Sequence, residues 1–128
     1  MDEKLLCAIS KITDEERRLL EGGSIDKSNY SSTGDFVIDS AHLVLRGKPV
    51  TVRTHTRFTD FPRHTHNYIE IIYMCKGKTV HTVNDTHTIE LKEGELLFLN
   101  NHASHGVART QRDDIAVNLI LGLNTLVK

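Results

Sequence analysis

The strand pattern between residues 36 and 121 constrains the fold more than any other feature of the sequence. Short stretches of β-branched and apolar residues alternate there with turn residues, the rhythm of a barrel or sandwich. Predicted strands cover Val50–Arg57, Tyr68–Cys75, Thr79–Val83, Thr86–Leu91, Leu96–Leu99, Gly106–Arg109 and Ile115–Leu121. Since a parallel crossover needs a dozen or more residues, strands joined by short links are expected to be antiparallel neighbours. The pattern predicts an all-β fold.

Two details refine this prediction. Asn84-Asp85 lies between two predicted strands, and both residue types tolerate the positive φ of a two-residue hairpin turn. The strand Tyr68–Cys75 is apolar on both faces, whereas a strand with one face in water would alternate. Both of its faces are therefore expected to be covered, one by the barrel interior and one by the opposite sheet, the N-terminal helix or a second subunit.

The N-terminal part has a helical pattern. Thr13 and Glu16 fit a capping box at a helix start, and Gly22-Gly23 ends that helix. Ser24–Gly34 has the composition of a loop. At 128 residues the chain suits a single hydrophobic core. The predicted organisation is a helical segment and loop over 1–34 and a β-barrel domain over 35–128.

Composition narrows the expected partners. The 16 basic and 17 acidic residues give a formal charge of -1, so this segment lacks the basic excess with which nucleic-acid binders neutralise phosphates. The sequence lacks a long apolar stretch of the kind that forms a signal peptide or a membrane span. Cys7 and Cys75 follow no metal or redox spacing and are expected to be reduced thiols. These features predict a cytoplasmic protein that binds neither membrane nor nucleic acid through this segment.

One group of residues has the chemistry of a metal or ligand site. His64, His66 and Glu70 share parity, so they point to one side of a strand, although Glu70 needs a bend to come close to the imidazoles. His105 follows the turn at Gly94, and a barrel could bring it alongside. Imidazoles with a carboxylate suit a divalent transition metal such as Zn, Fe, Mn, Ni or Cu.

The same residues resemble the first cupin motif. His64-Thr65-His66 is followed by Glu70 after three residues and by Gly77 after six more. The second motif is less complete. Gly94 and His105 match it at the right interval, while Asn100, His102 and Arg109 replace its usual proline, glycine and asparagine. The resemblance, over residues 50 to 121, implies a double-stranded β-helix, or jelly roll, with all four ligand positions occupied. A bound metal and a polar pocket of hydrogen-bonded side chains both stay open.

A second resemblance lies on top of the first. The runs His66–Gly77 and Leu91–Asn100, with Gly94-Glu95-Leu96-Leu97, resemble the N-terminal sensor domain of AraC-type transcription regulators. In that family the cupin binds a small effector or mediates dimerisation, and helix-turn-helix units at the C-terminus bind DNA. The resemblance implies a small-molecule sensor and homodimer. Because the sequence given ends at Lys128, the DNA-binding domain is expected to lie outside it, in a longer regulator.

Other functions are also consistent with a cupin sequence. A stand-alone metal-dependent enzyme, such as an oxygenase or a sugar isomerase, would use the same metal to activate dioxygen or to polarise a carbonyl. The sequence offers no further acid or base at a persuasive spacing, which favours the regulator. A storage or scaffold cupin without a ligand is a third interpretation.

Tyr68, the other histidines and three arginines have separate expectations. Tyr68 shares parity with His66 and either borders the pocket, orienting a ligand, or packs in the core. His102 is expected in a loop, and His81 and His87 are expected to face solvent on either side of the hairpin turn. His42 and His55 follow no pattern. Arg53, Arg57 and Arg63 could hold an anionic effector, but solvated surface positions are the simpler expectation.

Overall fold

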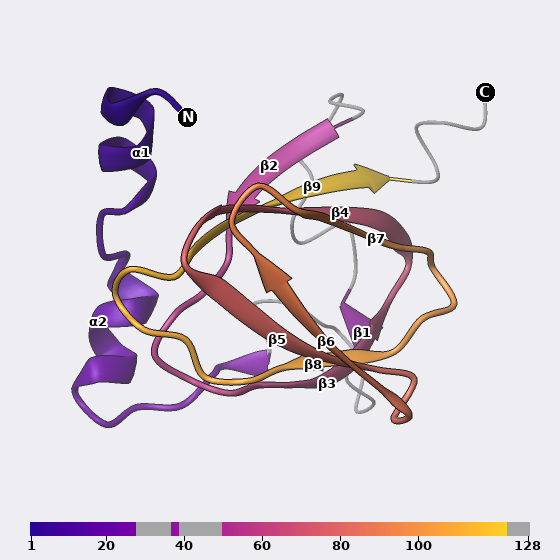
Figure 1. Cartoon of the computed structure of the whole chain (residues 1–128). Helices are drawn as coiled ribbons and strands as arrows, with labels where there is room; N and C mark the ends of the chain where they lie inside the picture. The colour runs from indigo at the N-terminus through magenta and orange to yellow at the C-terminus, as the bar shows by residue number, and fades with distance from the viewer. Residues whose placement is uncertain (28–36, 39–49, 123–128) are drawn as a thin grey trace.

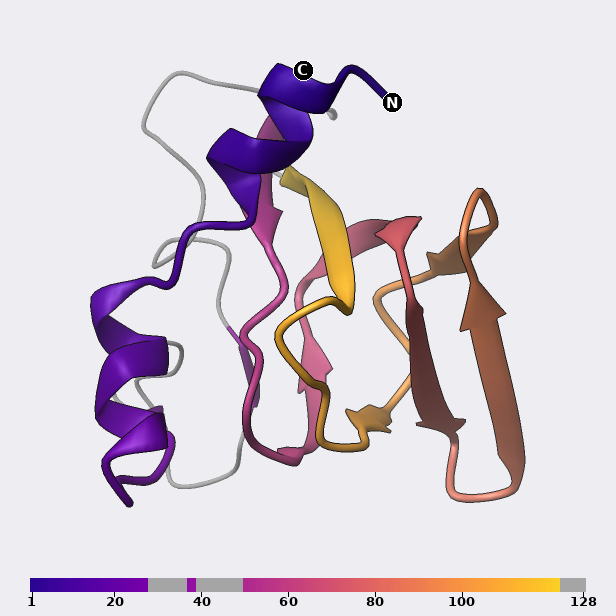
Figure 2. The ribbon, with the colours of Figure 1, turned by 60° about the vertical axis from the view of Figure 1, so that its left-hand side comes forward.

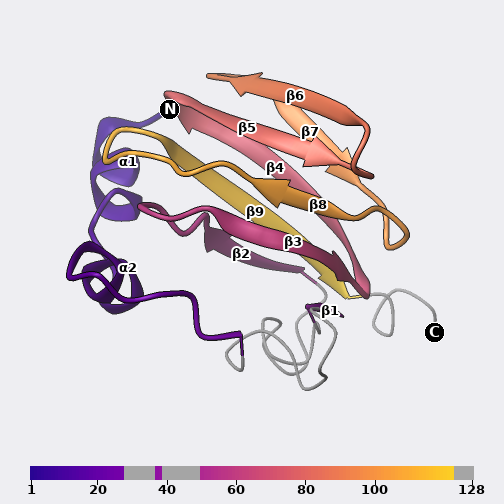
Figure 3. The same cartoon turned by 90° about the horizontal axis from the view of Figure 1, so that it is seen from below.

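Two β-sheets face each other and enclose the interior of the molecule (Figure 1). The computed structural model describes residues 1–27, 37–38 and 50–122. One sheet has the order β1-β3-β8-β5-β6 and the other the order β2-β9-β4-β7. All pairs are antiparallel except β1 with β3. Figure 3 shows the first sheet nearest the viewer. The all-β prediction is confirmed.

The strands run over β1 (Val37–Ile38), β2 (Val50–Thr54), β3 (Phe61–His66), β4 (Tyr68–Lys76), β5 (Lys78–Val83), β6 (His87–Lys92), β7 (Leu96–Leu99), β8 (His105–Val107) and β9 (Ile115–Gly122). The seven predicted strands all appear, with β2 shorter than expected and β8 shifted toward His105. Strand β3 was not predicted. Its sequence, Phe61 to His66, holds a proline and three basic or imidazole residues in place of an apolar run.

The chain turns a corner between β3 and β4. His66 is the last residue of β3, Asn67 forms a bend, and Tyr68 begins β4 in the other sheet. Strand β3 pairs with β8, and β4 pairs with β7 and β9. The bend that the sequence required between His66 and Glu70 is therefore a change of sheet, which turns the two residues toward each other across the interior.

Turn residues do what their chemistry predicts. Asn84 and Asp85 adopt φ of 52° and 61° in the β5–β6 hairpin, which confirms the expected turn. Gly77, between β4 and β5, has φ of 73°, and a Cβ there would contact the side chain of Asp114 and lie 2.7 Å from the Asp113 carbonyl oxygen. This turn is accessible to glycine alone.

Helices α1 (Glu3–Ile9) and α2 (Asp14–Leu20) lie along one side of the barrel (Figure 2). The predicted capping box is present: the Thr13 hydroxyl accepts from the Glu16 N–H, and the Glu16 carboxylate accepts from the Thr13 N–H. No helix in the described ranges is long and apolar enough to span a membrane. The loop predicted over Ser24–Gly34 falls mostly outside the described residues, as does His42.

A buried ion pair attaches α2 to the barrel. The Arg57 guanidinium donates to Glu16 Oε2 at 2.7 Å, and both side chains are 3% exposed. Arg57 also donates to the carbonyl oxygens of Ser10, Lys11 and Arg112. The expectation of a solvated Arg57 is therefore wrong, because this side chain satisfies the ends of three segments at once. Arg53 and Arg63 are exposed, as expected.

The two faces of β4 differ in burial, so the expected cover of both faces is present only on the inner one among the described residues. Tyr68, Glu70, Ile72 and Met74 face the interior and are buried, whereas Ile69, Ile71 and Tyr73 on the other face are only half-buried. Two clusters of buried apolar side chains fill the interior. Phe61, Tyr68, Val107 and Ile120 form the first, against which Ile25 packs, and Ile72, Met74, Leu91, Leu99, Ala103 and Ala116 form the second.

Candidate metal and ligand site

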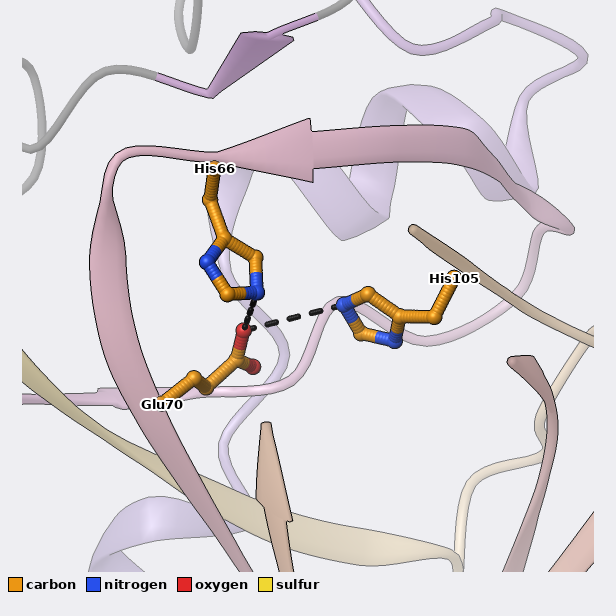
Figure 4. A group of neighbouring side chains, drawn as sticks. All are labelled: His66, Glu70 and His105. Atoms are coloured by element: carbon orange, nitrogen blue, oxygen red, sulfur yellow. Dashed lines mark ion pairs between the residues drawn. The ribbon is translucent and has the colours of Figure 1, made fainter. Parts of the chain in front are cut away.

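His66, Glu70 and His105 meet inside the barrel (Figure 4). One donor atom from each lies within 4.8 Å of the other two. His66 Nε2 is 3.4 Å and His105 Nε2 3.7 Å from Glu70 Oε2. The three residues come from β3, β4 and β8, so residues far apart in sequence converge because the two sheets close on each other.

His64 lies in the same chamber. It is buried, it stands opposite His105 in the β3–β8 register, and the two ring centroids are 4.4 Å apart. Its ring centroid is 6.2 Å from that of His66. The group of mutually close donor atoms does not include His64. Of the four predicted ligands, the structure thus brings three together and places the fourth beside them.

Backbone carbonyls orient two of the imidazoles. His64 Nδ1 lies 2.7 Å from the Pro62 carbonyl oxygen, and His66 Nδ1 lies 2.7 Å from that of Tyr68. A carbonyl oxygen only accepts, so Nδ1 of each ring must carry the proton and Nε2 keeps its lone pair. This is the arrangement by which proteins orient histidine ligands of metals.

Burial keeps the imidazoles neutral near pH 7. It lowers the pKa of His64 to about 3, helped by the neighbouring His105, and lowers the pKa of His105 to about 4. Burial also lowers the pKa of His66, against the attraction of Glu70. In the same chamber burial raises the pKa of Glu70, and the nearby histidines only partly oppose the rise. Neutral imidazoles offer lone pairs, so the donor set fits a divalent transition metal.

Tyr68 borders this chamber. Its ring stacks on that of His66, with centroids 4.3 Å apart and planes 13° from parallel. Tyr68 also packs in the first apolar cluster. The sequence left pocket lining and core packing open as alternatives, and the side chain does both.

A cavity of about 50 Å³ opens beside two of the three donors, Glu70 and His105. Its lining includes His55, His64, Glu70, His105 and Asn118. Ligand pockets usually measure ~300–1,000 Å³, so this chamber suits an ion with a few coordinated atoms. His55, to which the sequence assigned no role, lies in this lining with its Nε2 buried and without a hydrogen-bond partner.

Sequence reasoning misplaced His81. It was expected in solvent, but it is 1% exposed, and its ring lies 6.0 Å from that of His105. The sequence of β5 gave no clear signal of this, because its two valines, Val80 and Val83, fall on opposite faces of the strand. His87 and His102 are exposed, as expected.

Comparison with protein families identifies the family of the barrel. The family model described as the AraC-like ligand binding domain matches residues 48–122. The chain belongs to the AraC-like ligand-binding domain family. The matched residues hold every strand of the barrel from β2 to β9 and all four predicted ligands, and the cupin fold expected for this family is present. A search of curated proteins found no match.

Solved structures share the fold of the AraC-like domain. KdgF from Halomonas sp. is 18% identical with a TM-score of 0.51, over 58% of this chain and 70% of its own. Bacillus subtilis oxalate decarboxylase, in a study of its Mn(II) centres, is 16% identical with a TM-score of 0.51, over 59% of this chain and 22% of its own. A cupin-2 domain containing protein from Shewanella frigidimarina is 15% identical with a TM-score of 0.49, over 62% and 76%. At these identities the likeness to KdgF and to oxalate decarboxylase concerns the fold.

Proposed function

We propose that this AraC-like domain is the sensor of a cytoplasmic transcription regulator, and that a polar group of a small effector enters the chamber beside Glu70 and His105. The observation that carries the proposal is that the buried donors of His66, Glu70 and His105 converge and that a cavity opens beside two of them, Glu70 and His105. Buried polar atoms without partners are costly, and His66 Nε2 and His105 Nε2 are two such atoms. A ligand that bonds to these two nitrogens removes the free-energy cost of burying them without a partner, and this contributes to its binding.

We further propose that the effector is bound through a divalent metal held by His66, Glu70 and His105, with His64 as the fourth ligand of the set. The metal would supply a Lewis-acidic site for an oxygen atom of the effector. The residues supply the rest: Pro62 and Tyr68 carbonyls hold the rings of His64 and His66, and the buried Glu70 balances the charge. The chemistry of the donors suits Zn, Fe, Mn, Ni or Cu.

A short segment connects the chamber with α2. Thr54, His55 and Thr56 line the cavity, and Arg57, the next residue, pairs with Glu16 of α2. The Thr56 hydroxyl also donates to Glu15 Oε1 at 3.0 Å. An effector that shifts this segment would change how α2 sits on the barrel. This coupling is allosteric only if the two placements bind the effector with different affinity. We propose that DNA is bound by another domain of the regulator and not by this one.

Binding can be tested with the metals alone. Calorimetric titration of Zn²⁺, Mn²⁺ and Ni²⁺ into metal-free protein is expected to give one tight site for at least one of them. His66→Ala should lose that site, while the exposed His102→Ala keeps it. A storage or scaffold cupin predicts no binding by any of the three proteins.

A sensor must also return its ligand unchanged. Small carbohydrates and organic acids that raise the melting temperature of the metal-loaded protein are the compounds to follow, since a ligand of the native state stabilises by mass action. The compound recovered after long incubation should be identical to the one added. Its conversion, lost in His66→Ala, would identify the enzyme alternative instead.

The dimer interface that we propose is the outer face of the sheet β2-β9-β4-β7. Side chains directly opposite each other in register form three rows on that face: Val50, Leu121 and Ile69; Val52, Leu119, Ile71 and Phe98; and Thr54, Val117, Tyr73 and Leu96. All are apolar except Thr54, and Phe98 is 65% and Val52 60% exposed. A flat apolar sheet face packs well against a second copy of itself.

Sedimentation of Phe98→Asp tests this interface. The variant is expected to sediment as a monomer at concentrations where the unchanged protein is a dimer, because the introduced carboxylate would be buried without a partner. Leu5→Asp, at an apolar position of α1 that is 52% exposed, is the control and should stay dimeric. A dimeric Phe98→Asp would exclude this face.

A further inference from the structure

His81 is a buried histidine beside His105 that neither the cupin motifs nor the proposed ligand set uses. Its Nε2 lies 2.7 Å from the Thr79 hydroxyl, and its Nδ1 is buried without a partner. The side chain is almost fully enclosed, and its ring plane is 17° from that of His105 at a centroid separation of 6.0 Å. An imidazole in such a place has a specific protonation pattern.

Thr79 determines that pattern. Its hydroxyl donates to the sulfur of Met74, at 3.5 Å, and a thioether sulfur can only accept. The hydroxyl has one proton, so toward His81 its oxygen acts as the acceptor and the ring donates from Nε2–H. This assignment makes two hydrogen bonds where the reverse makes one. The side chain is 1% exposed, and burial disfavours the charged imidazolium, so the ring is neutral and Nδ1 carries the lone pair.

His105 lacks an acceptor for a proton on Nδ1. Both of its ring nitrogens are buried without a partner. Its Nε2 faces Glu70, and Figure 4 shows the other ring nitrogen, Nδ1, on the side away from that carboxylate. A neutral imidazole has one N–H and one lone pair. For Nε2 to act as a ligand, the proton must be on Nδ1, and unlike His64 and His66, His105 has no carbonyl oxygen that holds it there.

We propose that His81 is the positioning residue of His105. The His105 Nδ1–H donates to the His81 Nδ1 lone pair through one bridging water, since the structure shows no direct hydrogen bond of either atom. The resulting chain, from Met74 sulfur through Thr79 and His81 to His105, leaves the lone pair of His105 Nε2 directed at Glu70. This inference rests on the proposed metal site, and it assigns to His81 the orienting role that backbone carbonyls have for His64 and His66.

Metal affinity tests the role through two variants of His81. His81→Leu removes the acceptor and is expected to weaken Co²⁺ and Zn²⁺ binding by about 10- to 100-fold, the usual effect of losing such a partner. His81→Asn keeps an acceptor near the position of Nδ1 and should recover most of that loss. His87→Leu, in the adjacent strand but exposed, should bind as the unchanged protein does. The absorption spectrum of bound Co²⁺ should change in His81→Leu and return toward the original in His81→Asn.

The outcomes separate this inference from the proposed function. If the unchanged protein binds metal and a folded His81→Leu binds it equally well, His81 has no positioning role and the metal site stands. If the unchanged protein binds neither metal, both proposals fail.

Histidine ¹⁵N spectra of the unchanged, metal-free protein give a second test that needs no variant to fold. The expected tautomers are Nε2–H for His81 and Nδ1–H for His105. The opposite tautomer on His81, with the proton on Nδ1, would overturn the proposal.

Discussion

The guanidinium of Arg57 donates to the carboxylate of Glu16 at 2.7 Å, and only 3% of each side chain is exposed. Removing one partner of a buried ion pair leaves the other without compensation. Arg57→Gln is therefore expected to lower the free energy of unfolding by ~3–5 kcal/mol in urea denaturation.

A surface pair provides the control for this prediction. Arg63 and Asp85 are 2.9 Å apart but mostly exposed, so Arg63→Gln should cost at most ~1 kcal/mol. Equal effects of the two substitutions would mean that Arg57 does not attach α2 to the barrel.

The same pair predicts acid sensitivity. Burial alone would raise the pKa of Glu16, but hydrogen bonds from Arg57 and Thr13 outweigh it and hold this pKa below its ordinary value of 4.5. A carboxylate whose pKa is lower in the folded than in the unfolded state contributes stability above pH 4.5, which is lost as the pH falls through the folded pKa. In Glu16→Gln this part of the acid destabilisation should be missing. An unchanged loss of stability below pH 4.5 would contradict it.

Protonation of His55 affects stability over a higher pH range than protonation of Glu16. Burial, and secondly the neighbouring histidines His81 and His105, lower its pKa from 6.5 to about 3. Below pH 6.5 the unfolded chain takes up a proton at this residue that the folded protein refuses, so acid favours unfolding progressively down to about pH 3. Metal-free His55→Asn should therefore lose less stability than the unchanged protein between pH 6.5 and 4.5. Urea titrations at both pH values measure this, and equal losses would show that His55 is protonated in the folded state.

The glycine turn after β4 gives a steric prediction. At Gly77 a Cβ would meet both φ strain and the Asp113–Asp114 backbone and side chain, whereas at Gly94, with φ of 85°, it would meet open space. Strain alone costs ~1–2 kcal/mol. Gly94→Ala is expected to cost about that much and Gly77→Ala clearly more, by thermal or urea unfolding. Equal costs would mean that the contact with Asp114 relaxes freely.

Much of this architecture could be predicted from the sequence. Strands β4 and β9 are apolar at most positions, apart from Glu70 and Asn118, and the β5–β6 hairpin has Asn84-Asp85, so local patterns were sufficient there. Strand β3 was missed because it lacks an apolar pattern. His64 and His66 occupy inward positions where an ordinary strand has apolar side chains.

Residues whose role depends on tertiary contacts were harder to predict. His81 is a polar residue near a hairpin turn, which is typical of a surface position. The β5–β8 pairing, with His81 opposite Val107, places it inside. Arg57 likewise has no local signal, because its partners lie 41 to 55 residues away in the chain. His66, Glu70 and His105 were predictable because a family motif marks them, while the exclusion of His64 from the closest group follows from coordinates alone.

The metal content of freshly purified protein tests the central proposal most directly. Elemental analysis of the unchanged protein is expected to give about one equivalent of a single transition metal, as a site with one complete donor set requires. His66→Ala and Glu70→Gln should both be depleted of it, and His102→Ala should retain it. Equal metal content in all four proteins, or none in any of them, would contradict the metal site at His66, Glu70 and His105.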